Sequence, residues 1–325
     1  MWQELDNARF FITGGTGFFG VWLLETLARA QQHFALDLEA AILTRNPAAF
    51  AQKAPHLANN ARFRWLKGDV RTFPFPSGEF SHVIHGAGTS SRPIPAAEML
   101  DTLVDGARRV LQFSARSHCR RLLFISSGAV YGPQPPELPR IPETHPHAPD
   151  PIRPASVYGE GKRLAELLCA IATREANLPC VIARCFAFIG PHLPLDAHFA
   201  AGNFLRDAAN GGPIRVESDG RAARSWLHMA DLMIWLLTLL TRGKPAYPYN
   251  VGSDEHLPVA DLAARIKNSS GIACPVLIRD PPNPEPPPRY VPNICRAREE
   301  LGLEVRIGID EAILRTLTWM KELSP

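Results

Sequence analysis

The sequence predicts an α/β protein built on a doubly wound parallel sheet. A short apolar run at residues 10–13 meets a glycine-rich turn at residues 14–20, and apolar residues at helical spacing follow. Apolar, strand-like runs then alternate with helix-like segments as far as residue 171. Several of these runs are almost continuously apolar, as expected for strands covered by helices on both faces of a sheet.

Length and composition limit the class of protein. The chain has 325 residues, enough for a large α/β unit with a smaller second lobe, and 46% of them are hydrophobic. The net charge of +3 is spread along the chain and predicts no nucleic-acid surface. No apolar run reaches the roughly 20 residues of a membrane helix, no signal segment begins the chain, and no C-x-x-C pair occurs. We expect a cytoplasmic protein without a membrane segment or metal site.

The strand, turn and helix of residues 10–27 come first. Glycines at positions 14, 17 and 20 allow unusual backbone angles and let a phosphate approach the main chain, while the helix dipole favours an anion. We predict that this turn binds a dinucleotide. The expected contacts are Gly14, Thr16, Gly17, Phe18 and Phe19. Because the spacing is G-x-x-G-x-x-G, not the G-x-G-x-x-G of ordinary dehydrogenases, the glycines alone also fit a plain turn.

The second predicted strand, residues 40–45, ends at Arg45. In a dinucleotide-binding fold an acid here binds the ribose 2′-hydroxyl of NAD, whereas an arginine accommodates the 2′-phosphate of NADP. Because no acid is present, the sequence favours NADP over NAD, unless Arg45 is simply solvated. The third strand, residues 62–67, leads to Asp69 and Val70, where Asp69 either accepts from the adenine amino group or caps a turn.

The fourth predicted strand, residues 81–85, runs into three small residues, Gly86, Ala87 and Gly88. Small side chains let a cofactor and the backbone approach each other. We therefore expect cofactor contacts at these three positions, and we expect His85 to be a structural residue at the strand end.

A helix over residues 96–117 and a fifth strand over residues 122–127 follow. The prolines crowded between residues 133 and 154 exclude helix and central strand and predict a surface loop. In the second half we expect strands at 214–216 and 249–251, helices at 229–240, 258–266 and 311–323, and a Pro-rich connection at 280–292.

Tyr158 and Lys162 are four residues apart on a predicted helix and project from one face of it. A free phenol is a poor base at neutral pH, but a nearby ammonium and an oxidised nicotinamide favour the phenolate. Ser127, at the end of the fifth strand, can bind the same substrate oxygen. These three residues are the predicted catalytic group, and Tyr158 and Lys162 are also predicted cofactor contacts. A Tyr-x-x-x-Lys pair alone also fits an ordinary helix surface.

These segments resemble the extended short-chain dehydrogenase/reductase family, in its nucleotide-sugar epimerase/dehydratase branch. The resemblance implies a Rossmann-like sheet at residues 1–185, with return segments near 226–254, and a smaller, mainly substrate-binding lobe at residues 186–325. It also implies a nucleotide-diphosphate sugar as substrate and a homodimer formed by helices at 96–117 and 156–176. The matching segments are residues 13–20, 68–70, 85–88, 126–132, 158, 162, 184–191, 203–204, 224–231 and 250–253.

By the same resemblance, Asn203, Phe204, Arg224 and Arg289 contact the nucleotide or diphosphate of the substrate, and Cys185 contacts the cofactor. Arginine suits a diphosphate because its planar fork meets two phosphate oxygens at once. Without the family, Arg224 and Arg289 would be interpreted as members of surface ion pairs.

The sequence departs from this family at three places. Family dehydratases and glucuronate decarboxylases usually carry an acid after the catalytic Ser or Thr, where this chain has Gly128 and Ala129. A 4,6-dehydratase needs an acid/base pair to eliminate water, and these positions do not supply one. The family's Arg-x-Phe-Asn segment ends here in Ala187, and Arg45 replaces the acid that selects NAD.

The expected function is hydride transfer between NAD(P) and C4 of a nucleotide-diphosphate sugar, by a 4-epimerase or a 4-keto reductase. A nucleotide-sugar 4,6-dehydratase or UDP-glucuronate decarboxylase is the alternative. A catalytically silent NADP-binding sensor is a third possibility, against which the presence of all three catalytic residues argues. The base, the sugar and the oligomeric state stay open.

Overall fold

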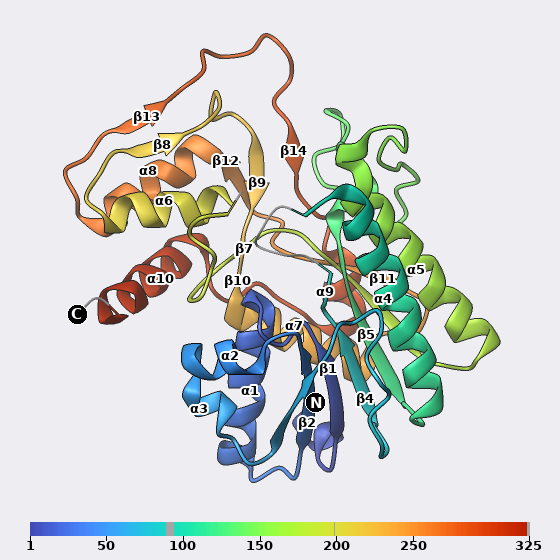
Figure 1. Ribbon diagram of the computed structural model, residues 1–325. Helices are drawn as coiled ribbons and strands as arrows, with labels where there is room; N and C mark the ends of the chain where they lie inside the picture. Colours follow the sequence, from blue (N-terminus) through green and yellow to red (C-terminus); the bar gives the residue numbers. More distant parts are fainter. Residues whose placement is uncertain (89–93, 198, 324–325) are drawn as a thin grey trace. The chain divides into compact units, whose positions relative to one another are not determined.

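The computed structural model describes residues 1–88, 94–197 and 199–323. Its contact pattern divides the chain into two compact units, each assembled from three stretches of sequence (Figure 1). Unit 1 comprises Met1–Gly132, Ala148–Arg184 and Met233–Tyr249. Unit 2 comprises Pro133–His147, Cys185–Leu232 and Asn250–Pro325.

A seven-stranded sheet, counted over the described residues, forms the centre of unit 1 in the order β11-β6-β5-β4-β1-β2-β3. Its strands are β1 (Arg9–Thr13), β2 (Glu39–Thr44), β3 (Phe63–Lys67), β4 (His82–His85), β5 (Arg121–Ser127), β6 (Cys180–Cys185) and β11 (Pro248–Val251). β1 pairs in parallel with both β2 and β4, so that Phe11 lies opposite Ala41 and Val83. The order turns back at β1, as in a doubly wound sheet, and the predicted fold class is confirmed.

Helices cover both faces of this sheet. In Figure 1, α4 (Ala96–Arg116) and α5 (Val157–Glu175) run side by side on one face, and α1 (Phe18–Phe34) lies on the other. Shorter helices α2 (Pro47–Lys53) and α3 (Pro55–Ala58) follow β2. The 3₁₀ turns are η1 (Trp2–Leu5), η2 (Gly128–Tyr131) and η3 (Pro154–Ser156). α7 (Met229–Arg242) begins in unit 2 and ends in unit 1.

Aromatic rings fill the core between the sheet and α4. The Phe11 ring of β1 lies 4.5 Å from Phe113 of α4 and 5.3 Å from Phe73, measured between ring centres. Phe80 packs edge-on against Phe113 at 5.3 Å. The guanidinium of Arg109 covers this cluster and donates to the Phe73 carbonyl at 2.7 Å. Burial of these large rings contributes to fixing β1, whose carboxyl end carries the glycine turn.

Unit 2 combines helices with short sheets. Its helices are α6 (Ala200–Ala209), α8 (Val259–Ser270), α9 (Cys295–Leu301) and α10 (Ile309–Leu323), of which α6, α8 and α10 contact one another. Its sheets, in the described residues, are β12-β9-β14, β13-β8 and β10-β7. The strands are β7 (Phe188–Ile189), β8 (Ile214–Val216), β9 (Ala223–Ser225), β10 (Leu227–His228), β12 (His256–Pro258), β13 (Val276–Ile278) and β14 (Arg289–Tyr290).

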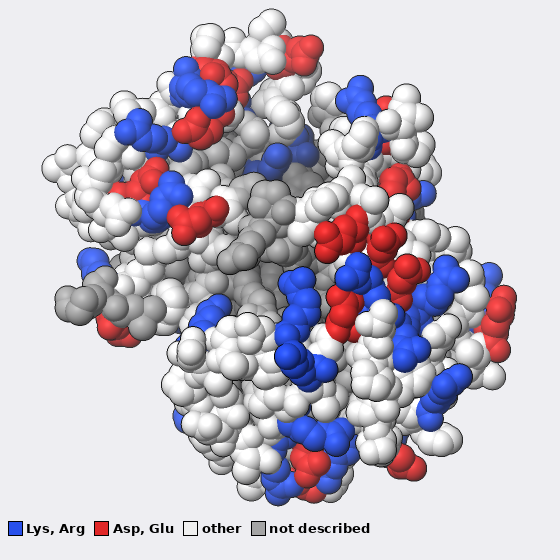
Figure 2. Space-filling view, in the orientation of Figure 1, with Lys and Arg blue, Asp and Glu red and all other residues white. Residues whose placement is uncertain are grey.

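The described surface carries mixed charge. On the face drawn in Figure 2, basic and acidic side chains are interspersed. Among the described helices, none has both the length and the apolar character that crossing a bilayer requires. Within the same residues, no cluster of three or more His, Cys, Asp or Glu side chains is arranged to hold a metal ion.

Candidate active site

The turn between β1 and α1 is closely packed because its glycines leave no space for side chains. Gly14 has a left-handed backbone (φ 77°), and a Cβ atom there would lie 2.6 Å from the carbonyl carbon of Gly86. A Cβ atom on Gly20 would lie 2.3 Å from the Gly14 oxygen. α1 begins after Gly17 without a side-chain cap, which suits an anion at its first amides. The turn contains the predicted cofactor residues Gly14, Thr16, Gly17, Phe18 and Phe19.

Two arginines and a carboxylate follow the carboxyl ends of β2 and β3. Arg45 is exposed. The Oδ1 and Oδ2 atoms of Asp69 accept hydrogen bonds from Nε and Nη2 of Arg71, at 2.9 and 2.8 Å. This hydrogen bonding, with a further contribution from Arg45, lowers the pKa of Asp69. Val70 is buried and packs against α4 at Gly106.

Thr13 joins the ends of β1 and β4. Its carbonyl oxygen accepts from the Gly86 amide at 3.1 Å, and its hydroxyl accepts from the Ala87 amide at 3.2 Å. The same hydroxyl lies 2.7 Å from Nδ1 of His85, which is fully buried. Gly88 follows with a φ of 150°, a conformation that favours glycine. Thr13 therefore holds residues 86 and 87 beside the glycine turn.

The predicted catalytic residues lie where β5 meets α5. Ser127 ends β5, and its Oγ accepts from the Ala129 amide at 3.1 Å. Lys162 Nζ donates to the Ile125 carbonyl at 2.7 Å and lies 5.9 Å from the centre of the Tyr158 ring. Ser127 and Lys162 are only 7% and 3% exposed. The structure thus places Ser127, Tyr158 and Lys162 on two elements that pack against each other within unit 1.

Two glycines between Tyr158 and Lys162 let α5 pack closely against η2 and α4. A Cβ atom on Gly159 would lie 2.6 Å from the Ala129 oxygen in η2. A Cβ atom on Gly161 would lie 2.7 Å from the Leu103 side chain of α4. The two glycines of the pattern Tyr-Gly-Glu-Gly-Lys therefore permit close packing of α5.

A buried ion pair behind the catalytic residues was not predicted from the sequence. Arg184 Nη2 lies 2.7 Å from Glu166 Oε2, with both side chains largely buried. Glu166 is four residues beyond Lys162, and this helical spacing could have placed it on the same face. Nothing local in the sequence identifies Arg184 of β6 as its partner.

In unit 2, Arg224 is the central residue of β9. Its guanidinium lies 5.7 Å from the centre of the Tyr290 ring and donates to its neighbour's carbonyl, Ala223 O, at 3.2 Å. Burial lowers the pKa of Arg224, while Tyr290 acts in the opposite direction. A desolvated guanidinium beside an aromatic ring is suited to bind an anion.

The other predicted substrate residues of unit 2 are more dispersed. Strand register pairs Tyr290 with Arg224, so Arg289 lies on the opposite face of the small sheet, where it contacts His256 at 3.4 Å. Asn203 lies on α6, 3.4 Å from Arg206 Nη1. Phe204 is buried, and so is Cys185, the predicted cofactor contact.

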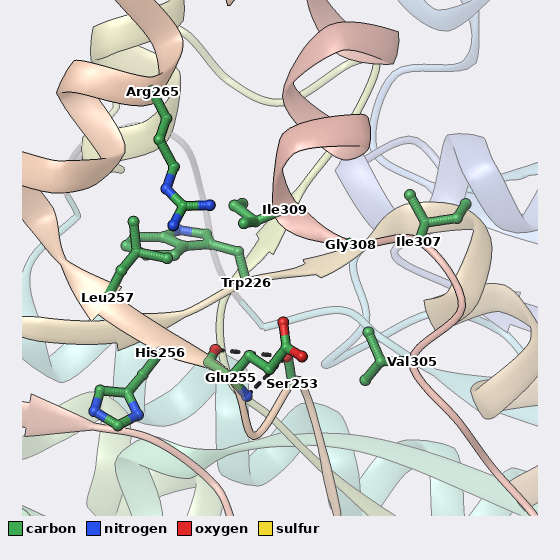
Figure 3. Close-up of a pocket in the computed structure, with 10 residues that line it drawn as sticks. All are labelled: Trp226, Ser253, Glu255, His256, Leu257, Arg265, Val305, Ile307, Gly308 and Ile309. Carbon is green, nitrogen blue, oxygen red and sulfur yellow. Dashed lines mark hydrogen bonds between the residues drawn. The ribbon is translucent and has the colours of Figure 1, made fainter.

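A small pocket of about 80 Å³ lies elsewhere in unit 2, beside β12 and the start of α10 (Figure 3). Figure 3 shows Arg265 and Trp226 among the residues that line it, and Arg265 also pairs with Asp310 at 2.9 Å. Its described lining includes Ser253 and His256 but none of the predicted substrate residues. The pocket is too small for a nucleotide sugar.

The sheet order, the first turn and the Tyr-x-x-x-Lys helix together place the protein in the extended short-chain dehydrogenase/reductase class, as the sequence predicts. More specifically, the chain belongs to the NAD dependent epimerase/dehydratase family, which matches residues 10–252. The predicted class of enzyme is confirmed, and so is a nicotinamide cofactor. The family description names NAD, whereas the sequence favours NADP.

Relatives and solved structures agree with this assignment. UDP-glucuronic acid decarboxylase 4 of Arabidopsis thaliana is 29% identical over 308 residues, covering 94% of this chain and 67% of that protein. UDP-glucose 4-epimerase of Thermotoga maritima, solved with UDP-glucose, has a TM-score of 0.81 at 20% identity, covering 97% of this chain and 99% of that one. UDP-glucuronic acid 4-epimerase of Bacillus cereus, solved with NAD, has a TM-score of 0.81 at 18% identity, covering 98% and 100%. The two solved structures share the fold of this chain.

Proposed function

We propose that the protein catalyses hydride transfer at C4 of a nucleotide-diphosphate sugar, as a 4-epimerase or a 4-keto reductase. The observation that supports this proposal is that Ser127 ends β5 while α5, which packs against β5, carries Tyr158 and Lys162. Tyr158 would exchange a proton with the C4 oxygen, and Ser127 would bind and orient that oxygen. The ammonium of Lys162 would favour the phenolate of Tyr158.

The glycine turn supports dinucleotide binding. Gly14 and Gly20 let the backbone of the turn pack closely, because a Cβ atom on either residue would collide with neighbouring main chain, and the uncapped start of α1 suits a pyrophosphate. When bound, the nicotinamide supplies the hydride acceptor and donor for C4. Arg224, a desolvated cation of unit 2, is the proposed contact for the sugar's diphosphate. Asn203, Phe204 and Arg289 remain proposed substrate contacts, and Cys185 a proposed cofactor contact.

Residues 128 and 129 support C4 chemistry without dehydration. Gly128 and Ala129 form the turn directly after Ser127 and carry no carboxylate. Elimination of water needs an acid and a base beyond those that oxidise C4. A 4-epimerase or a 4-keto reductase needs only the Ser127 and Tyr158 hydroxyls and Lys162.

For the cofactor, we propose that the chain binds NAD and that Arg45 lets it accept NADP as well. The family description and the Bacillus cereus neighbour name NAD. Arg45 is exposed at the end of β2, where an acid would repel a 2′-phosphate. Titration of Arg45→Asp with both cofactors tests this: affinity for NADP should fall at least about tenfold while affinity for NAD holds or improves. Equal effects on both would contradict it.

Decarboxylation is the second candidate, and the named activity of the Arabidopsis relative favours it. The experiment offers UDP-glucose, UDP-galactose and UDP-glucuronate to the purified protein with NAD or reduced cofactor, and follows the sugars by NMR. Inversion at C4 without net use of cofactor indicates a 4-epimerase. Release of carbon dioxide with formation of a UDP-pentose indicates the decarboxylase. Stoichiometric oxidation of reduced cofactor by a UDP-4-keto sugar, offered as a fourth substrate, indicates the 4-keto reductase. No turnover of any of the four sugars, with NAD still bound, would contradict all three activities and favour a sensor.

We also propose a homodimer through α4 and α5. Apolar side chains on these helices are exposed by 40% or more: Leu100, Leu164, Leu167 and Ile171. Exposed apolar residues gathered on neighbouring helices are typical of protein interfaces. Analytical ultracentrifugation of the wild type and of Leu167→Glu tests the dimer, which the charged side chain should dissociate.

A further inference from the structure

Two successive turns of α5 hold two neighbouring residues of β5. Lys162 Nζ donates to the Ile125 carbonyl at 2.7 Å, and Ser126 Oγ donates to Glu166 Oε1 at 2.6 Å. Lys162 and Glu166 are four residues apart and project from the helix face that also carries Tyr158. The end of β5 is therefore fixed to this helix face at two adjacent points.

The second partner of Glu166 is Arg184 on β6. Arg184 donates through Nη2 to Oε2 at 2.7 Å and through Nε to Oε1 at 3.0 Å, in a bidentate pair. Its Nη1 donates to the Tyr131 hydroxyl at 2.9 Å, and its guanidinium lies 4.8 Å from the centre of the Tyr131 ring. Because Ser126 and Tyr131 begin and end segment 126–131, one ion pair holds both ends of that segment.

Burial makes these contacts strong. Glu166 is 8% exposed, and Ser126 and Tyr131 are each 2% exposed. Burial opposes the charge on Arg184, but its hydrogen bonds and attraction to Glu166 outweigh this and raise its pKa. Charge-assisted, bidentate hydrogen bonds are stronger and more directional than neutral ones. The Glu166–Arg184 pair is therefore suited to fix the position of segment 126–131.

We propose that Glu166 and Arg184 are positioning residues, which hold Ser127 in place relative to Tyr158 for the reaction. They act through the two ends of segment 126–131 and do not themselves contact the sugar oxygen. This inference rests on the proposed function, because it assumes that the Ser127 and Tyr158 hydroxyls share one substrate oxygen. A displacement of about 1 Å at such a site costs roughly a hundredfold in rate.

The test removes one contact at a time. Ser126→Ala deletes the hydroxyl that Glu166 binds but leaves the Glu166–Arg184 pair, so the fold is kept. We expect its kcat to fall about 10- to 100-fold, with the KM for the sugar and the dissociation constant of NAD changed less than about threefold. Ser126→Thr retains a hydroxyl and should recover most of the kcat. Glu166→Gln, a second variant, should lower kcat at least as much.

A matched control separates positioning from stability. Arg121 lies at the opposite end of the same strand, where its Nε donates to the Leu240 carbonyl at 2.6 Å. Arg121→Lys should lower the melting temperature without lowering kcat. If the wild type turns over a nucleotide sugar but Ser126→Ala keeps its full kcat, the positioning role is overturned and the proposed function stands. If the wild type turns over none, both fail.

Discussion

The hydroxyl of Thr13 lies 2.7 Å from Nδ1 of His85 and also accepts the amide hydrogen of Ala87 at 3.2 Å. One side chain at the end of β1 thus holds the end of β4 and the loop that follows. The loop in turn packs against the glycine turn, because Gly14 touches Gly86. The Thr13 hydroxyl is therefore one of the links between the two segments of the proposed cofactor site, beside the Gly86 amide bond to the Thr13 carbonyl and the packing of Gly14 on Gly86.

Thr13→Val should weaken both stability and cofactor binding. It keeps the volume but leaves the Ala87 amide and the buried His85 without the hydroxyl, at a cost of about 1–3 kcal/mol in the free energy of unfolding. Urea denaturation and NAD titration measure the two effects. Thr13→Ser, which keeps the hydroxyl, should retain most of the NAD affinity. A Val variant that binds NAD as the wild type does would show that the hydroxyl does not organise the site.

Stability should fall as the pH falls from 6.5 towards 4. Burial, helped by Lys162, lowers the pKa of His85 from 6.5 to about 3, and burial with Arg120 and Arg121 lowers that of His82 to about 4. Between the folded and unfolded values the unfolded chain binds more protons, so the stabilisation is complete above 6.5 and is lost on acidification. The urea concentration at the midpoint of unfolding, measured between pH 6.5 and pH 4, should fall as the pH is lowered. His82→Gln should flatten the slope, and an unchanged slope would exclude His82 as a contributor.

Gly14→Ala should abolish cofactor binding. It should also lower the free energy of unfolding by several times the amount that a positive φ alone costs an alanine. The new methyl group would meet the Gly86 backbone at 2.6 Å, in addition to the strain of a positive φ. Gly211→Ala is the control, because Gly211 has a similar φ of 68° and a Cβ atom added there would meet no described atom within 4 Å beyond its chain neighbours. That variant should lose only about 1–2 kcal/mol of unfolding free energy. Equal losses in the two variants would contradict the close packing of the turn.

Tyr158→Phe should lower kcat by about a hundredfold or more while leaving NAD affinity nearly unchanged, since only the proton-transfer group is removed. Lys162→Met should lower kcat and also destabilise the chain, because the buried Ile125 carbonyl loses its donor. Steady-state kinetics and thermal denaturation distinguish the two variants. Full turnover by Tyr158→Phe would contradict the proposed chemistry.

The sheet of unit 1 could be predicted because its strands carry their signal locally. Residues 122–125 form a continuous apolar run within the strand expected at 122–127, and the structure has β5 at Arg121–Ser127. The helix expected at 96–117 is α4, Ala96–Arg116, where apolar spacing follows one face. Such periodicity depends only on neighbours in sequence. The helix expected at 258–266 is α8, Val259–Ser270, with Pro258 as its N-cap.

The long-range contacts could not be predicted in this way. β14 consists of Arg289 and Tyr290 in a Pro-rich connection, and only its pairing with β9 makes it a strand. Likewise Glu166 and Arg184 are 18 residues apart, on a helix and a strand, and no local pattern joins them. The residues proposed to react could be identified from the sequence. The Glu166–Arg184 ion pair could not, because it forms only when α5 packs against β6.

The interleaving of the two units has a consequence for biosynthesis. The central sheet ends at β11, Pro248–Val251, so a nascent chain cannot complete it until residue 251 has been translated. β6 gains its second neighbour, β11, only after the second stretch of unit 2, Cys185–Leu232, has left the ribosome. A chain released early would expose the edge of β6 to pairing with other polypeptides.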